Sequence, residues 1–298
     1  MRIIQCAICK TNKNTSVLFP ETMDFKTIDA DIFSARRIPD QVHYQLLQCH
    51  RCGLIFSSPI LSENALKKLY RESKLTYDNE IESLKVTYGN YLQKTLNHAV
   101  KNPKLLEVGG GNGFFLEQAK DLGVLDVSGV EPSQHAVDQA RSDIKKKMVV
   151  DFFPSKKIKP LSKDIICVFQ TLDHITDPNS FLKACHRTLK KNGLVLTILH
   201  DTQGLSVKLL KEKSPIFDIE HIFLFNKQTL KKIFEQNGFQ AVEVFAVKNT
   251  FPIRYWIRMF PLPIQVKQLL IFLLKAIGLD GFPITLGAGN IGIIAKKQ

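Results

Sequence analysis

The sequence has few acidic residues and lacks long apolar runs. Its longest apolar stretch, LLIFLLKAIGL, is interrupted by a lysine and is too short to span a bilayer. The opening residues, MRIIQCAICK, lack the long apolar segment of a secretory signal peptide. We therefore expect a cytoplasmic protein, in which cysteine thiols stay reduced. Asp and Glu total 28 against 41 Lys and Arg, so the net charge of +13 favours anionic ligands or surfaces.

Low-complexity segments and internal repeats are also lacking, which excludes a disordered chain or a solenoid. A hydrophobic fraction of 44% is ample for a packed core, and 298 residues fit one large domain with additions, or two domains. The lysines occur in short runs such as Lys145–Lys147. Such runs are typical of solvated faces rather than of a continuous nucleic-acid-binding stripe.

Cysteine is scarce, but four of the six cysteines form two Cys-x-x-Cys pairs. This spacing lets two thiolates of one tight turn reach the same metal ion, and two turns complete a tetrahedral four-sulfur zinc site. Because four sulfur ligands leave no open position, we predict a structural zinc ribbon over residues 1–58, with a loop inserted between the pairs. Unrelated reduced thiols are the alternative. The predicted ligands are Cys6, Cys9, Cys49 and Cys52.

Strand and helix patterns alternate from about residue 103. Helical patterns cover 113–123, 134–143 and 179–191, the last opened by Asp177-Pro178 and ended by Asn192-Gly193. Residues 59–298 are therefore predicted to form a doubly wound α/β domain with a seven-stranded Rossmann-like sheet, whose ligands bind at the carboxyl ends of the strands. Apolar runs predict strands at 104–109, 125–132, 147–153, 164–172, 194–200, 240–249 and 290–297.

A glycine-rich turn follows the first of these strands. Gly109, Gly111 and Gly113 allow the backbone to approach a ligand closely, at a helix start with free N–H groups. A dinucleotide fingerprint would carry its last glycine at position 114, which is Phe114, so the fit to NAD is poor. Glu107 disfavours a pyrophosphate and suits an ammonium group. With an acid at the end of the second strand for the ribose hydroxyls, the pattern indicates S-adenosylmethionine.

These residues resemble those of the class I S-adenosylmethionine-dependent methyltransferases, over roughly residues 60–298. LLEVGGGNG resembles the family's first motif and GVEPS its second. DHITDPNSFLKACHRTLKKNGLVLTI resembles the region of the fourth and fifth strands, and EHIFLFNKQTLKKIFEQNGF the segment before the sixth strand in the small-molecule branch. The amino-terminal segment ending in CHRCGLIFSSP resembles a subgroup with a zinc-binding front piece.

The resemblance implies roles for individual residues. Glu107 and the three glycines match the motif that holds the methionine part of the cofactor, and Glu131 matches the acid that binds the ribose. Asp151 and Phe152 match the residues at the adenine. Gln170 and His174 match residues that line the cofactor and the acceptor. Asp173 keeps the charge of an acid that relatives often carry before this histidine, on a shorter side chain.

Methyl transfer to a hydroxyl needs a base that removes the proton. We predict His221, in the acceptor-side segment, as the first candidate and His174 as the second. His200, which closes the fifth strand beside Asp201, is a further candidate. For each of these histidines, a purely structural role at a strand end is the alternative.

A segment rich in apolar, aromatic and basic residues separates the last two predicted strands. We predict that this insert, residues 249–288, covers the acceptor pocket. A helix packed on the sheet edge is a compatible alternative. Peripheral membrane contact through residues 251–280 is a third interpretation, because Arg254, Arg258, Lys267 and Lys275 flank apolar residues there.

Taken together, the sequence predicts a methyltransferase that uses S-adenosylmethionine, carries zinc, and acts on a small-molecule biosynthetic intermediate such as a sugar or glycolipid precursor. An RNA methyltransferase is an alternative suggested by the net charge of +13 and the zinc ribbon. The chain lacks the Asn/Asp-Pro-Pro-aromatic signature of base amino methylation, so we expect nucleic acid not to be the substrate. A non-catalytic zinc-ribbon binding protein on a methyltransferase core is the other alternative.

Overall fold

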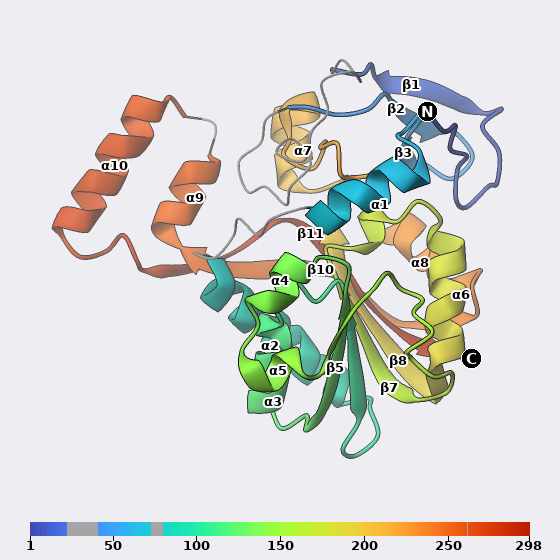
Figure 1. Ribbon diagram of the computed structural model, residues 1–298. Helices are drawn as coiled ribbons and strands as arrows, with labels where there is room; N and C mark the ends of the chain where they lie inside the picture. The colour runs from blue at the N-terminus through green and yellow to red at the C-terminus, as the bar shows by residue number, and fades with distance from the viewer. Residues whose placement is uncertain (23–40, 73–79, 261) are drawn as a thin grey trace.

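A seven-stranded mixed sheet forms the centre of the molecule (Figure 1). The computed structural model describes residues 1–22, 41–72, 80–260 and 262–298. The strand order is β10-β11-β8-β7-β4-β5-β6; the last five strands of this order are parallel, and β11 runs antiparallel between β8 and β10. The strands are β4 (Lys104–Val108), β5 (Asp126–Glu131), β6 (Met148–Val150), β7 (Lys163–Phe169), β8 (Leu189–His200), β10 (Phe239–Pro252) and β11 (Pro283–Lys297).

Helices cover both faces of the sheet, which confirms the predicted α/β class. On one face α2 and α3 bury Leu92 and Phe115 against the strands. On the other face α6 and α8 bury Phe181 and Leu230 in a core that also includes Phe56 of the amino-terminal segment. The helices are α2 (Ile81–Leu96), α3 (Phe114–Asp121), α4 (Gln134–Asp138), α5 (Ser142–Lys145), α6 (Pro178–Thr188) and α8 (Lys227–Glu235).

Two helix boundaries differ from the prediction. The helix predicted over 134–143 is divided into α4 and α5, because the backbone at Arg141 is extended, with ψ 141°. The helix predicted to end at Asn192-Gly193 ends at Thr188. Leu189 is fully buried and already paired with Lys163 on β7, so the chain continues as β8, and the Asn-Gly pair lies where the β7–β8 register shifts.

A smaller four-stranded sheet, in the order β1-β2-β3-β9, packs above the carboxyl ends of the large sheet (Figure 1). β9 comes from the later part of the chain, so the segments on either side of the predicted boundary at residue 58 share one sheet. The predicted loop between the cysteine pairs includes residues 23–40, which lie outside the described residues. The elements are β1 (Thr15–Phe19), β2 (Leu46–Cys49), β3 (Ile55–Ser57), β9 (Phe223–Leu224) and the helix α1 (Glu63–Glu72).

The predicted insert consists of a lengthened hairpin with two helices at its tip. β10 and β11 stay paired as far as Pro252 and Pro283, beyond the strand ends predicted from the sequence. The tip holds α9 (Ile253–Met259) and α10 (Ile264–Ala276), which extend away from the sheet (Figure 1). Within the described ranges, no helix has both the length and the apolarity needed to cross a membrane.

Candidate functional site

A cavity of about 1040 Å³ lies at the carboxyl ends of the parallel strands, between the sheet, α1 and α9. This is the edge at which an α/β sheet places its ligands. The cavity brings together most of the predicted site residues. The predicted residues that line it are Glu107, Gly109, Gly111, Glu131, Asp151, Phe152, Gln170, His174 and His221, together with His200.

The glycine turn after β4 follows the strand directly. Gly109 has a φ of +78°, and a Cβ there would lie 2.4 Å from Oγ1 of Thr171, so only glycine fits. Gly113 has a φ of +75° and precedes α3; a Cβ at this position would lie 2.5 Å from Cγ2 of Ile144. Gly113 does not line the cavity. Glycine is required at this position because φ is positive and because a Cβ would be too close to Ile144.

Glu107 lies beneath this turn. It is only 3% exposed, and its Oε2 atom has no hydrogen-bond partner among the described residues. Burial, together with the charge of Glu131, raises the pKa of Glu107 well above its usual value. A buried carboxyl group without a partner is costly, so this site suits a ligand that brings a cationic donor. The ammonium group of the methionine part of S-adenosylmethionine fits that requirement.

Glu131, at the end of β5, is held in place by the backbone. Its Oε2 accepts a hydrogen bond from the Gly111 N–H at 3.0 Å, and its Oε1 accepts one from the Ser133 N–H at 2.9 Å. Burial raises the pKa of Glu131, and these two hydrogen bonds oppose the shift. Each carboxylate oxygen keeps a second lone pair, so the group can also accept hydrogen bonds from two ribose hydroxyls.

The predicted adenine end of the cavity lies beyond β6. Asp151 accepts a hydrogen bond from the Phe152 N–H at 2.8 Å. The Phe152 ring lies under Lys67 and Arg71 of α1, which are 5.9 and 5.4 Å from its centroid. At the end of β7, Gln170 has a positive φ of 45°, and its Oε1 has no partner among the described residues. Strained backbone of this kind is concentrated at functional sites.

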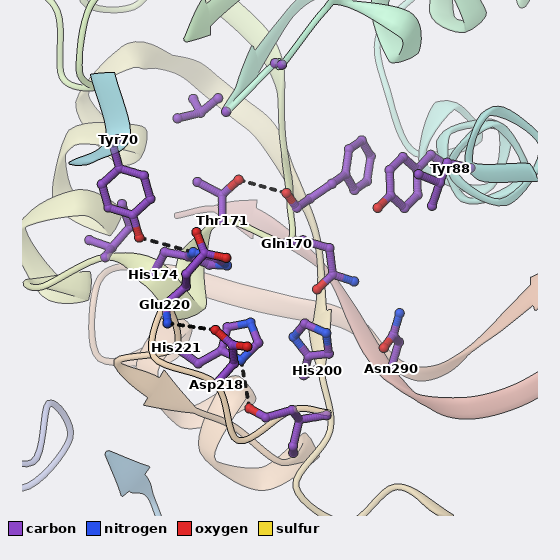
Figure 2. A pocket seen from close by; sticks show the side chains of 18 of the residues that line it. Tyr70, Tyr88, Gln170, Thr171, His174, His200, Asp218, Glu220, His221 and Asn290 are labelled. Carbon is purple, nitrogen blue, oxygen red and sulfur yellow. Dashed lines mark hydrogen bonds between the residues drawn. The ribbon is translucent and has the colours of Figure 1, made fainter. Parts of the chain in front are cut away.

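Three histidines surround the buried carboxylate of Asp173. His200 donates from Nδ1 to Oδ2 of Asp173 at 2.9 Å. Nε2 of His174 lies 3.7 Å from Oδ1, and Nε2 of His221 lies 3.9 Å from Oδ2. Figure 2 shows the three rings gathered in one part of the cavity, with Tyr70 beside His174. The two histidines predicted as bases and the third candidate therefore share one carboxylate.

The charges of this cluster are set by burial and by mutual contact. Burial by itself would raise the pKa of Asp173, but His174, the hydrogen bond from His200, and His221 outweigh it and lower that pKa. Burial lowers the pKa of His174 to about 3, although Asp173 opposes the shift. His174 is therefore neutral near pH 7. Its Nδ1 shares a 3.2 Å hydrogen bond with the Tyr70 hydroxyl.

His221 is held by the amino-terminal sheet. Its Nδ1 donates to the Ile216 carbonyl at 2.7 Å, which leaves Nε2 as the proton-accepting nitrogen. Ser57, at the end of β3, donates from its hydroxyl to the His221 carbonyl at 2.8 Å, and its N–H donates to the Ile222 carbonyl. The strand that leaves the second cysteine turn thus fixes the position of a predicted catalytic residue.

Sequence reasoning missed several members of this half of the site. The central position of Asp173 was not predicted, although its place before His174 in the LDH triplet was a signal. The sequence carried no signal for Tyr70 or Ser57. Ligand atoms of Asp173, His200 and His221 lie within 4.8 Å of one another, close enough to hold a cation as well as a proton.

The four predicted zinc ligands also lie together. Their sulfur atoms are all within 4.8 Å of one another, and those of Cys6 and Cys52 are 3.4 Å apart. Each pair lies on a tight turn: the Lys10 N–H donates to the Cys6 carbonyl, and the Gly53 N–H donates to the Cys49 carbonyl. Gly53, which follows the second pair, has a φ of +79°, a left-handed conformation that glycine adopts without strain.

Comparison with known proteins places the chain in a family. The family described as "Methyltransferase domain" matches residues 82–244. A ubiquinone biosynthesis O-methyltransferase of Pelagibacter ubique is 32% identical over 100 residues, which cover 32% of this chain and 41% of that protein. The enzyme of the same name from Histophilus somni is 27% identical over 150 residues, covering 45% of this chain and 62% of that protein.

Solved structures show the same fold. Geranyl diphosphate C-methyltransferase from Streptomyces coelicolor superposes with a TM-score of 0.51 at 15% identity, over 76% of this chain and 82% of that one. The matched segments span about two fifths to three fifths of the two O-methyltransferases, and the family match covers more than half of this chain. The chain therefore belongs to the methyltransferase-domain family.

Proposed function

We propose that the protein transfers a methyl group from S-adenosylmethionine to a hydroxyl oxygen of a small molecule. The observation that carries this proposal is that one cavity joins the buried acid Glu107, whose Oε2 has no hydrogen-bond partner among the described residues, to the cluster of Asp173 and three histidines. The first feature suits a cationic amino-acid ligand, and the second can accept a proton. When bound, S-adenosylmethionine supplies an electrophilic methyl group on its sulfonium.

The chain's own residues would hold this cofactor in an extended arrangement. Glu107 binds the ammonium group of the amino-acid end, which the glycine turn lets approach the backbone closely, and Glu131 binds the ribose hydroxyls. Asp151 accepts from the adenine amino group, and Phe152 packs on the ring. Gln170 lies between the cofactor end and the histidine cluster. Its buried Oε1, which has no partner among the described residues, suits a donor on either ligand.

The histidine cluster would remove the hydroxyl proton of the acceptor. His221, the predicted base, and His200 each donate from Nδ1, so Nε2 is the nitrogen that accepts the proton. His200 makes the shorter contact with Asp173, which stays ionised and stabilises the imidazolium that forms. His174, whose pKa is lowered to about 3 by burial, orients the acceptor by hydrogen bonding instead of holding the proton.

The experiment is to incubate the protein with S-adenosylmethionine labelled in its methyl group and with candidate acceptors. The curated relatives are ubiquinone biosynthesis O-methyltransferases, so hydroxylated ubiquinone precursors come first, followed by sugars and glycolipid precursors. We expect label in an O-methyl ether. Cofactor binding with transfer only to RNA would favour the alternative substrate class. Failure to bind the cofactor would favour the non-catalytic interpretation.

The amino-terminal sulfur cluster is the second part of the proposal. Tetrahedral zinc with 2.3 Å bonds to sulfur has ligand atoms roughly 3.8 Å apart, and the sulfurs of Cys6 and Cys52 are 3.4 Å apart. The four thiols therefore fit a structural zinc ion that joins the two turns. Elemental analysis should find near-stoichiometric zinc in protein purified without added metal. Cys49→Ser should lose it, and His50→Ala, on the adjacent exposed residue, should keep it.

A further inference from the structure

The helix α10 presents apolar side chains to solvent. None of its thirteen residues, all of them described, is buried, and it packs against α9 at the tip of the hairpin. Exposed apolar side chains surround much of the helix, Ile264 and Phe272 among them, and five others follow a helical spacing that forms a continuous stripe, which extends into the residue after the helix. The stripe consists of Val266, Leu269, Leu270, Leu273 and Ile277, which are 36–66% exposed.

Basic residues accompany this apolar surface. The segment from 251 to 282 contains four basic residues and one acidic residue, Asp280. Arg254 is paired with Asp280 at 3.1 Å, so Arg258, Lys267 and Lys275 supply the positive charge around the stripe. Phe260 and Phe282, which are 57% and 58% exposed, extend the apolar surface towards the body of the molecule.

The same projection forms one wall of the cavity. Tyr255, Trp256 and Met259 of α9 line it, and so does Phe260. The helix α7 (Leu205–Leu210) contributes Leu205 and Leu209, which line the cavity and are also 57% and 63% exposed. An apolar path therefore runs from the histidine cluster along α7 and α9 to the surface around α10.

We propose that α9 and α10 dock on the surface of an anionic lipid bilayer, and that the acceptor is an amphipathic molecule that enters the cavity from that bilayer. A short helix with an exposed apolar stripe and flanking cations lies in the plane of such an interface. The hydroxyl-bearing head of the acceptor reaches the histidines, and its apolar part lies against α7 and α9. The statement about the acceptor rests on the proposed methyl transfer, whereas the docking does not.

Charge favours a bilayer over a second copy of the chain as the occupant. A two-fold contact would bring this surface against itself, and so would place Arg258, Lys267 and Lys275 against like charges. Anionic headgroups complement those same residues, and each contributes about 1 kcal/mol, or roughly fivefold in affinity.

The experiment measures co-sedimentation of the full chain with vesicles of phosphatidylcholine containing phosphatidylglycerol, and with vesicles of phosphatidylcholine alone. We expect binding to the anionic vesicles and much weaker binding to the neutral ones. The double variant L269E/L273E should lower that affinity by at least roughly 10-fold. Its matched control is Leu125→Glu, at an 81% exposed leucine outside the projection. Lys275→Ala should lower the affinity for anionic vesicles about fivefold. Lys146→Ala, at another exposed lysine, should leave that affinity unchanged.

Trp256, the single tryptophan of the chain, gives an independent readout from α9. Its fluorescence should shift to the blue with anionic vesicles and be quenched by lipids brominated on their acyl chains. S-adenosylmethionine affinity, measured on every variant, checks that the fold is intact. Docking without methyl transfer would overturn the statement about the acceptor and leave the docking standing. Three results would each overturn the docking: wild-type protein that stays in the supernatant, equal binding by L269E/L273E, or a wild-type dimer that this variant dissociates.

Discussion

The two halves of the cavity are built in different ways. The cofactor half consists of backbone turns at the ends of neighbouring strands, with the buried acid Glu107 and the half-buried acid Glu131, which suit a cationic, ribose-containing ligand. The acceptor half consists of side chains from distant segments, grouped around Asp173 and bordered by an apolar wall on α7 and α9. Because the two halves are made of different residues, cofactor affinity and turnover should respond to different substitutions.

The largest effect is expected in the acceptor half. His200→Ala and His221→Ala should each lower turnover by about 10²–10⁴-fold, the usual contribution of a general base. Cofactor affinity should stay unchanged, because neither ring belongs to the cofactor half. Turnover is measured by transfer of labelled methyl, and affinity by calorimetry. His135→Ala, at an exposed histidine of α4, is the matched control. Equal losses of affinity and turnover would contradict the separation of the halves.

The next effect should be confined to the cofactor half. Glu131→Ala removes two backbone contacts and the group proposed to bind the ribose. A lost charge-assisted hydrogen bond costs about 1.5–3 kcal/mol, which corresponds to an affinity roughly 10- to 150-fold lower. Turnover at saturating cofactor should change little. Asp126→Asn, at the other end of β5, serves as the control. Calorimetry showing unchanged affinity for Glu131→Ala would refute the ribose assignment.

A smaller effect should reach the acceptor half from the zinc turns. Because β3 follows the second cysteine pair and its Ser57 holds the His221 carbonyl, Cys49→Ser should loosen the position of that histidine. Displacement of a catalytic group by a fraction of an ångström lowers the rate, here on the order of 10-fold. Cofactor affinity should be retained. If Cys49→Ser loses zinc while turnover stays normal, the four-stranded sheet does not position the histidine cluster.

The smallest effect concerns the stability of the cofactor-free protein. The pKa of Glu107 is raised by burial, so the folded state holds a proton that the unfolded state releases above the ordinary value of 4.5. The contribution of Glu107 to the free energy of unfolding therefore falls as pH rises from 4.5 towards the raised pKa. Glu107→Gln should remove the fall and stabilise the free protein near neutral pH by on the order of 1 kcal/mol, while weakening cofactor binding.

Denaturant unfolding of both proteins between pH 5 and 8 measures this difference, and Glu117→Gln, at a partly exposed acid on α3, is the control. The gap between wild type and Glu107→Gln should widen with pH. A constant gap would mean that Glu107 is not held in its protonated form.

The cofactor half could be predicted from the sequence because its parts are local. An apolar run followed by Glu107 and the glycine turn defines a strand, a turn and a helix start within ten residues, and Glu131 ends the next strand. The prediction that β8 begins at residue 194 was wrong, because tertiary pairing of Leu189 overrides the turn propensity of the Asn-Gly pair.

The acceptor half could be predicted only in part because its contacts are long-range. His221 and His174 were identified as candidates one by one, but their convergence on Asp173 depends on pairing between β3 and β9. Ser57 and His221 are separated by 164 positions, and no local pattern reports their contact. The length of the β10–β11 hairpin was also missed, because its outer residues carry no strand alternation that sets them apart from the helices at its tip.

Titration calorimetry on the purified protein tests the central claim most directly, because it needs no acceptor. We predict that S-adenosylmethionine and its demethylated product bind with a stoichiometry of one, and that Glu131→Ala weakens both while Asp126→Asn does not. NAD should show no comparable binding. Absence of heat with S-adenosylmethionine, or equal affinity for NAD, would contradict the assignment of the glycine turn and with it the proposed function.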